Sequence, residues 1–226
     1  MNNDFQAYNT VSAGAFDDLL RPDELTAKKT QNFLQLLENQ GIKTILHMGY
    51  GPTAVGLAQA GYEITCIDAN TKTTHSVDLN GTFDAVIALD EYFTFAKTEE
   101  QQRDLINTAF NLTKKILITT LSDYKNMTEN HREFSDPQSY KTVNGSTIYL
   151  ERHAKNSRNS WNTKVHKILE SDECITFGPF ARRSLFFKQL ARMSADAGST
   201  SFEFQKSMMY KGMLQKNYQH IIVIKF

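Results

Sequence analysis

Cysteine is scarce in this chain of 226 residues, and the two that occur, Cys66 and Cys174, lie far apart. They form no C-x-x-C pair, and no histidine cluster accompanies them at the spacing of a metal site. We therefore expect neither a structural disulfide nor a bound metal ion.

The chain also lacks a net charge, because 25 basic side chains balance 25 acidic ones. No field of the whole molecule then attracts it to nucleic acid or to an anionic membrane, so either partner would need a local patch. The start, MNNDFQAYNT, lacks the features of a signal peptide, and no apolar run approaches the ~18 residues that a membrane span needs. We expect a cytoplasmic protein without a membrane anchor.

The hydrophobic fraction of 40% is sufficient for a sizeable core. The length is large for one domain and short for two. Residues 1–226 are therefore predicted to form a single α/β domain with an insertion.

The segment Lys43–Asn70 organises the rest of the chain. It contains an apolar run that ends at Met48, a turn with Gly49 and Gly51, a short helical stretch, and a second apolar run that ends at Asp68. This order predicts a β-α-β unit.

The chemistry of such a unit follows from its geometry. Glycines after the first strand let the backbone approach a ligand, and the next helix begins with free N–H groups. An acid at the end of the second strand, here Asp68, can accept hydrogen bonds from the hydroxyls of a ribose. A nucleoside-containing cofactor is the resulting hypothesis. The pattern also fits NAD, but none of the nine tyrosines has the Y-x-x-x-K spacing of a short-chain dehydrogenase.

The remaining elements alternate as in a parallel sheet. A helix is predicted from Pro22 to Gly41, and a capping box at Thr98–Gln101 opens another before Lys114. A third helix is predicted over Arg182–Ala197. Further strands are predicted at 83–89, 116–120, 200–205 and 219–226, the last two as a terminal hairpin. Between Asp68 and the strand at 83–89, either a brief strand at 75–79 is present or one helix of the standard layout is missing.

Residues 122–180 interrupt this alternation. They begin with a polar loop, followed by period-2 stretches at Thr147–His153 and Trp161–Leu169 and a short run at Cys174–Phe177. This pattern predicts an antiparallel β-rich insertion that covers the carboxyl ends of the sheet, where ligands of open α/β folds bind.

Three motifs resemble those of the class I S-adenosylmethionine-dependent methyltransferases: ILHMGYGPT at 45–53, YEITCIDAN at 62–70 and FDAVIALDEYF at 83–93. The resemblance implies a Rossmann-like α/β fold with a mostly parallel seven-stranded sheet and a C-terminal antiparallel hairpin. The β-rich insertion lies outside it.

The resemblance also implies S-adenosylmethionine as the cofactor and a set of residues around it. Gly49 and Gly51 would flank its methionine part, Asp68 its ribose and Asp78 its adenine, and Leu89 would line the sulfonium side. The implied cofactor-binding residues are His47, Gly49, Tyr50, Gly51, Asp68, Ala69, Asp78 and Leu89. The family's usual acid in the first strand is His47 here, and its third glycine is Thr53.

Methyl transfer to a small acceptor is the predicted function. The chain has neither the proline-containing loop of nucleobase amino-methylating enzymes nor a Pro-Cys nucleophile, which leaves direct in-line transfer to an O, N or S atom. Asp90, Glu91 and His153 are the predicted catalytic residues, with His131 as a further candidate base.

A run of cations without an acid, Arg152 to Leu169, suggests an acceptor that carries a carboxylate or phosphate. It would also suit an RNA backbone with stacking on Trp161, although net neutrality favours a small molecule. A non-catalytic cofactor-binding module, an RNA methyltransferase and an NAD-dependent oxidoreductase stay open as alternatives.

Overall fold

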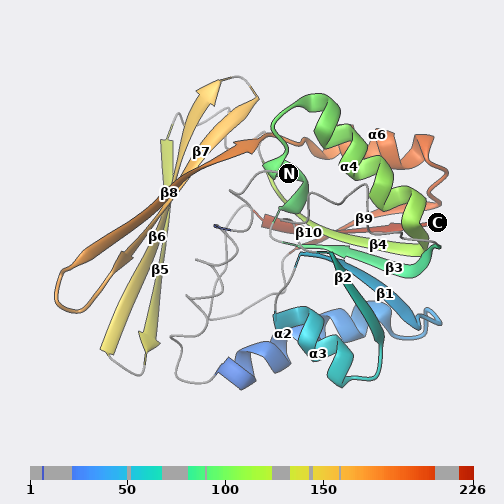
Figure 1. Cartoon of the computed structure of the whole chain (residues 1–226), viewed down its shortest axis with the longest axis horizontal. Coiled ribbons are helices and arrows are strands. Elements are labelled where there is room, and N and C mark those ends of the chain that lie inside the picture. Colours follow the sequence, from blue (N-terminus) through green and yellow to red (C-terminus); the bar gives the residue numbers. More distant parts are fainter. Residues whose placement is uncertain are drawn as a thin grey trace.

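The computed structural model describes residues 7, 22–49, 52–67, 81–89, 91–123, 133–142, 145–157, 159–206 and 219–226. Within these residues, six strands form a central sheet in the order β2-β1-β3-β4-β10-β9 (Figure 1). The four strands on one side of the sheet run parallel, and β10 and β9 add an antiparallel edge. The strands are β1 (Thr44–Met48), β2 (Glu63–Ile67), β3 (Phe83–Ala88), β4 (Thr113–Ser122), β9 (Ser201–Lys206) and β10 (Gln219–Lys225).

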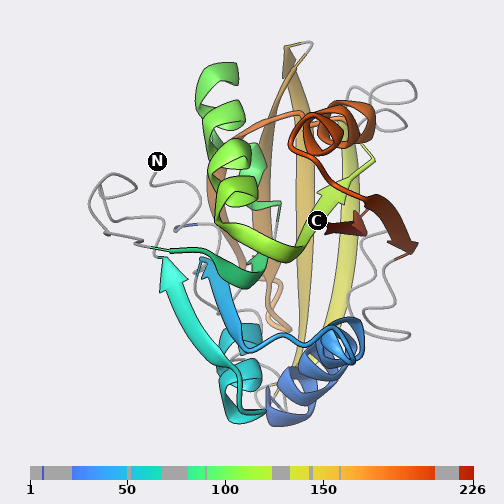
Figure 2. The ribbon, with the colours of Figure 1, turned by 90° about the vertical axis from the view of Figure 1, so that its right-hand side faces the viewer.

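Helices cover both faces of this sheet. The helices α2 (Pro22–Leu37) and α3 (Pro52–Gln59) lie on one face, and α4 (Glu99–Leu112) and α6 (Phe187–Asp196) lie on the other (Figures 1 and 2). A short 3-10 helix, η1 (Tyr92–Phe95), follows β3. The arrangement confirms the predicted α/β fold with a mostly parallel sheet and a terminal hairpin.

The start of α4 has the predicted capping arrangement. The Thr98 side chain accepts a hydrogen bond from the Gln101 N–H at 3.1 Å. The Gln101 side chain in turn accepts from the Lys97 N–H at 3.2 Å, one residue earlier than in the standard capping box. The first contact satisfies an N–H group that the helix start leaves without a partner, and the second fixes the residue that precedes the cap.

Six of the seven strands predicted for the central sheet are therefore present. The predicted strand at 75–79 lies outside the described residues. The other predicted strands differ from the structure only at their ends, most of all β4, which extends beyond the predicted 116–120 in both directions.

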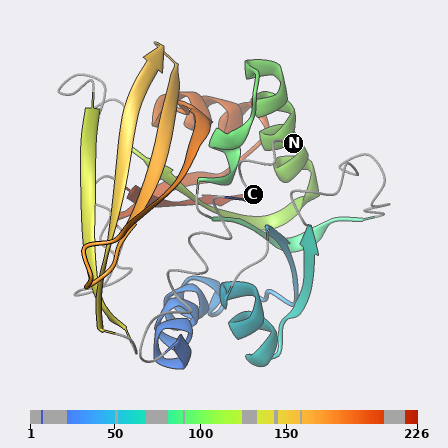
Figure 3. The ribbon, with the colours of Figure 1, turned by 60° about the vertical axis from the view of Figure 1, so that its left-hand side comes forward.

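A second, four-stranded antiparallel sheet has the order β5-β6-β7-β8. We call it the second sheet. It stands beside the carboxyl ends of the parallel strands (Figures 1 and 3). Its strands are β5 (Glu133–Thr142), β6 (Gly145–Ser157), β7 (Ser160–Ile168) and β8 (Cys174–Arg183).

Two expectations for this region were wrong. The stretch predicted as a polar loop contains β5, which pairs with β6 along its whole length. In addition, β8 continues to Arg183, so the helix expected from Arg182 begins only at Phe187. Arg182 is held in a strand because it pairs with Trp161 of β7.

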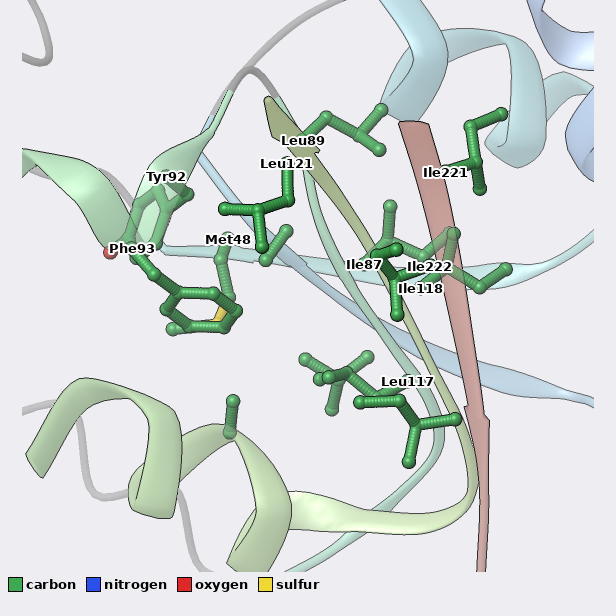
Figure 4. Packing of buried hydrophobic residues seen from close by; sticks show 14 of the residues in the cluster. Met48, Ile87, Leu89, Tyr92, Phe93, Leu117, Ile118, Leu121, Ile221 and Ile222 are labelled. Atoms are coloured by element: carbon green, nitrogen blue, oxygen red, sulfur yellow. The ribbon is translucent and has the colours of Figure 1, made fainter. Parts of the chain in front are cut away.

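The two sheets share one hydrophobic core. Trp161, Val165 and Phe180 of the second sheet belong to the same buried cluster as the central strands. Figure 4 shows the part of that cluster where Tyr92 and Phe93 of η1 lie near Met48 and Leu121. The packing supports a single structural unit.

Candidate functional site at the carboxyl edge of the central sheet

The glycine turn after β1 has the backbone geometry that the β-α-β unit requires. Gly49 is buried and has a φ of 100°, a backbone conformation that residues other than glycine rarely adopt. Its N–H donates to the Ile67 carbonyl at 2.9 Å, which links the ends of β1 and β2. Tyr50 and Gly51 lie outside the described residues, and α3 begins at Pro52.

His47 supports this turn from inside the sheet. Its side chain is 4% exposed, and Nδ1 lies 3.0 Å from the Gly49 carbonyl oxygen. A carbonyl can only accept, so Nδ1 carries the proton in this contact. The described role of His47 is therefore to hold the Gly49 peptide. Its contact with a cofactor stays a prediction.

The ends of β2 and β3 supply the other side of the candidate site. Asp68, Ala69, Asp78 and Asp90 lie outside the described residues, so their assigned roles stay predictions. Leu89 is 8% exposed, and its carbonyl accepts a hydrogen bond from the Tyr92 N–H at 3.1 Å.

Glu91 lies in a buried ion pair. Its carboxylate bonds to the Arg182 guanidinium through Oε2 and accepts from the Ser122 hydroxyl through Oε1. Both members of the ion pair have side chains that are 3% exposed. The Glu91 N–H donates to the Thr120 hydroxyl at 3.0 Å, so the backbone of this turn is fastened to β4 as well.

The second sheet divides the predicted basic run between its two faces. Successive side chains of a strand point to opposite faces, and the register sets Arg152 opposite Lys164, with His153 opposite Thr163. Trp161 shares the face of His153 and is buried against the core, so this inner face is the one that meets the central sheet. Strand alternation sends Arg152 and Lys164 outward, so these two cations of the run do not share the face of His153.

His153 lies on the inner face with its imidazole partly buried. Its Nδ1 is 3.0 Å from the Thr163 hydroxyl, and Thr163 is fully buried. The register places His153 two strands away from Phe180 of β8, a separation of about 10 Å at the usual strand spacing.

Trp161 is not available for stacking on RNA bases. Its side chain is 1% exposed, and its indole N–H donates to the Ser184 hydroxyl at 3.0 Å. Exposed aromatic faces are what single-stranded RNA stacks on. The RNA interpretation loses its only proposed stacking residue.

The outer face has a different electrostatic character. Arg152 and Lys164 are exposed there, and His166 shares that face. Burial, followed by the positive charges of Arg152 and Lys164, lowers the pKa of His166.

Metal and membrane features can be assessed only where the chain is described. There, no three His, Cys, Asp or Glu side chains come together in a way that could hold a metal ion. Across the same ranges, no helix combines the length and the apolar character that crossing a membrane requires.

Arg182 is the residue of this region that the sequence did not reveal. It stood next to the strong amphipathic pattern of α6 and was assigned to that helix. The signal that could have found it is the period-2 extension of β8 through Phe180 and Arg182, both of which are buried.

Solved methyltransferase structures have the same fold over almost their whole length. An S-adenosylmethionine-dependent methyltransferase from Clostridium acetobutylicum superposes with a TM-score of 0.62 at 11% identity, covering 97% of this chain and 98% of that one. The CcbJ methyltransferase from Streptomyces caelestis superposes with a TM-score of 0.63 at 14% identity, covering 88% of this chain and 94% of that one. The sugar N-methyltransferase KedS8 from Streptoalloteichus superposes with a TM-score of 0.60 at 13% identity, covering 88% of this chain and 87% of that one.

No protein-family model and no curated protein matches the sequence. At such low identities the structural likeness establishes the fold alone. The chain thus has the fold of the class I S-adenosylmethionine-dependent methyltransferases, as the three sequence motifs implied.

Proposed function

We propose that this protein transfers a methyl group from S-adenosylmethionine to a small-molecule acceptor. The observation that carries the proposal is the juxtaposition of two features in a methyltransferase fold. The glycine turn lies at the carboxyl edge of the parallel strands, and the second sheet stands beside that edge and presents His153 on its inner face.

The residues at the edge fit such a cofactor. The buried Gly49 has the positive φ that brings a backbone close to a ligand, and the first turn of α3 follows directly. Leu89 is buried and directly follows the last residue of β3. When bound, the cofactor would supply an activated methyl group on a sulfonium. We assign the ribose to Asp68, and the adenine to the region of Asp78.

Among the predicted bases, His153 suits the proton-accepting role better than Glu91. Both carboxylate oxygens of Glu91 are already bonded within a buried ion pair. His153 lies partly exposed on the face toward the central sheet. An acceptor O–H or N–H that loses its proton as the new bond to carbon forms could pass that proton to the imidazole.

A small acceptor with an amine or a hydroxyl fits better than a polynucleotide. The buried Trp161 gives bases no surface to stack on, and two exposed cations of the basic run face away from the central sheet. One similar structure is a sugar N-methyltransferase, which makes amino sugars the first acceptors to test. An anionic acceptor would depend on Lys155 and Lys167, which share the inner face by register.

Thermal denaturation with different cofactors tests the proposal. S-adenosylhomocysteine at about 100 times its Kd should add about 2.7 kcal/mol of stability, because it binds only the native state. For a protein of this size this raises Tm by about 5–10 °C. Asp68→Ala should abolish the shift, whereas Asp104→Ala, a change on the exposed side of α4, should leave it intact.

The alternatives give different results in the same assay. A shift with NAD alone would favour an oxidoreductase. A shift with S-adenosylhomocysteine but no turnover of any amine or hydroxyl acceptor would favour a non-catalytic cofactor-binding module. No shift with S-adenosylhomocysteine would refute the proposal.

A further inference from the structure

The ion pair of Glu91 and Arg182 is a buried polar connection between the second sheet and the turn that follows β3. Glu91 is in the turn directly after β3, and Arg182 is in the last part of β8. The guanidinium carbon also lies 4.7 Å from the centre of the Phe95 ring. The pair therefore joins the edge where the methyl donor is proposed to bind to the sheet that is proposed to hold the acceptor.

The carboxylate side of the pair is fixed in place by several bonds. Glu91 has a φ of 58°, a conformation that is uncommon for a residue with a side chain. Its N–H is held by Thr120, its carbonyl accepts the Thr94 hydroxyl at 2.8 Å, and its carboxylate accepts the Ser122 hydroxyl. A carboxylate fastened in this way offers Arg182 one direction of approach.

The segment around Arg182 has further polar contacts with the same region. Gln102 of α4 donates to the carbonyls of Phe93 at 3.1 Å and of Arg183 at 3.4 Å. The Arg183 side chain pairs with Glu99 at 2.8 Å, but Glu99 is 70% exposed. Exposed pairs contribute little, so the buried contact of Arg182 is the directional one.

Stability alone does not explain such a pair. Burying two charges costs several kcal/mol in solvation, and apolar residues of similar volume often replace a buried ion pair without loss of stability. A guanidinium bound to a fixed carboxylate does, however, define a distance and an angle that apolar contacts leave free.

We propose that Glu91 and Arg182 are positioning residues that set the second sheet over the methyl-transfer edge in one orientation. The contacts of Glu91 and Arg182 support the fixed orientation of the second sheet, and its use in methyl transfer rests on the proposed function. In-line transfer requires the acceptor atom about 3 Å from the methyl carbon, and a displacement of about 1 Å can cost about 100-fold in rate. The pair supplies the rigidity that this alignment needs.

The fluorescence of Trp161, the only tryptophan of the chain, can report whether the second sheet keeps its position. It lies on the inner face next to Arg182, is 1% exposed and belongs to the common core. A second sheet that moves away from the central sheet would admit a quencher to this indole. Acrylamide quenching of its fluorescence therefore measures the position of the sheet without an acceptor.

The central variant is Glu91→Leu with Arg182→Leu, which removes both charges together. We expect it to keep its far-ultraviolet circular dichroism and its Kd for S-adenosylhomocysteine within about twofold, while the quenching constant of Trp161 rises at least about threefold. Arg183→Leu is the matched control and should leave the quenching unchanged. A folded double variant with Trp161 as protected as in the wild type would overturn the proposal.

The single variants Arg182→Lys and Arg182→Leu keep the test decisive if the double variant does not fold. Arg182→Lys retains the positive charge, so quenching should rise by a smaller factor than in Arg182→Leu. Equal protection of Trp161 in the wild type and in Arg182→Leu would overturn the inference in that case. Failure of the wild type to bind S-adenosylhomocysteine would refute the proposed function alone, because the quenching result does not depend on it.

Discussion

Gly56 of α3 provides the sharpest test of how the helix behind the glycine turn is held. A Cβ at this position would lie 1.9 Å from the Thr30 hydroxyl oxygen and 2.9 Å from the Thr30 Cβ. Rotation of the Thr30 side chain could relieve the first contact but not the second, because the backbone of α2 fixes that carbon. Gly56→Ala must therefore push α3 away from α2.

The expected cost follows from two opposing terms. Overpacking of a tight contact costs typically 1–3 kcal/mol, and steric contacts below 3 Å place this site at the upper end. The higher helix propensity of alanine relative to glycine stabilises α3 by about 1 kcal/mol. A net loss of about 2 kcal/mol lowers Tm by about 4–8 °C for a protein of this length. Since α3 follows the glycine turn, affinity for S-adenosylhomocysteine should fall as well.

Denaturation by urea, with two matched variants, measures this cost. Ala58→Gly, at an exposed position of the same helix, should cost about 1 kcal/mol through propensity alone. Thr30→Ala combined with Gly56→Ala should restore only part of the loss, because it removes the hydroxyl and the methyl group of Thr30 but leaves the Cβ at 2.9 Å. A Gly56→Ala protein as stable as the wild type would refute the close approach of α2 and α3.

Three further predictions concern charge and capping. The Asp84 carboxylate accepts the N–H groups at the start of β1 at 2.8 and 3.2 Å, and these bonds lower its pKa. Its stabilising effect is then present above the usual Asp pKa of about 3.9 and is lost as pH falls through the lowered value. Asp84→Asn should cost about 1 kcal/mol in urea unfolding at pH 7. The cost should shrink as pH falls below the usual Asp pKa of about 3.9, and a cost that stays constant across this range would contradict the assignment. Thr98→Ala should cost about 1 kcal/mol in the same measurement through loss of the α4 cap, and Thr108→Ala, inside the helix, should cost less. Replacing Arg152 and Lys164 with Ala should leave acceptor kcat/KM unchanged within about twofold, and a larger loss would place the acceptor on the outer face.

Local patterns in the sequence determined most of the central sheet. The apolar run before Gly49, the cap at Thr98 and the terminal hairpin each depend on residues that are neighbours along the chain, and each appears in the structure as predicted. The glycine turn was predicted for the same reason, since a positive φ is a property of one residue. The sequence was therefore sufficient for the methyltransferase fold.

Only the tertiary structure decided which side chains meet. Glu91 and Arg182 are 91 positions apart, and no local pattern indicates that they form a pair. The strand β5 contains Pro137 and mostly polar residues, and it is a strand because β6 pairs with it. The register of β6 and β7 separated Arg152 from His153, although they are adjacent in the chain. Contacts of this kind depend on strand pairing and packing across the whole domain, and short-range sequence patterns carry no information about them.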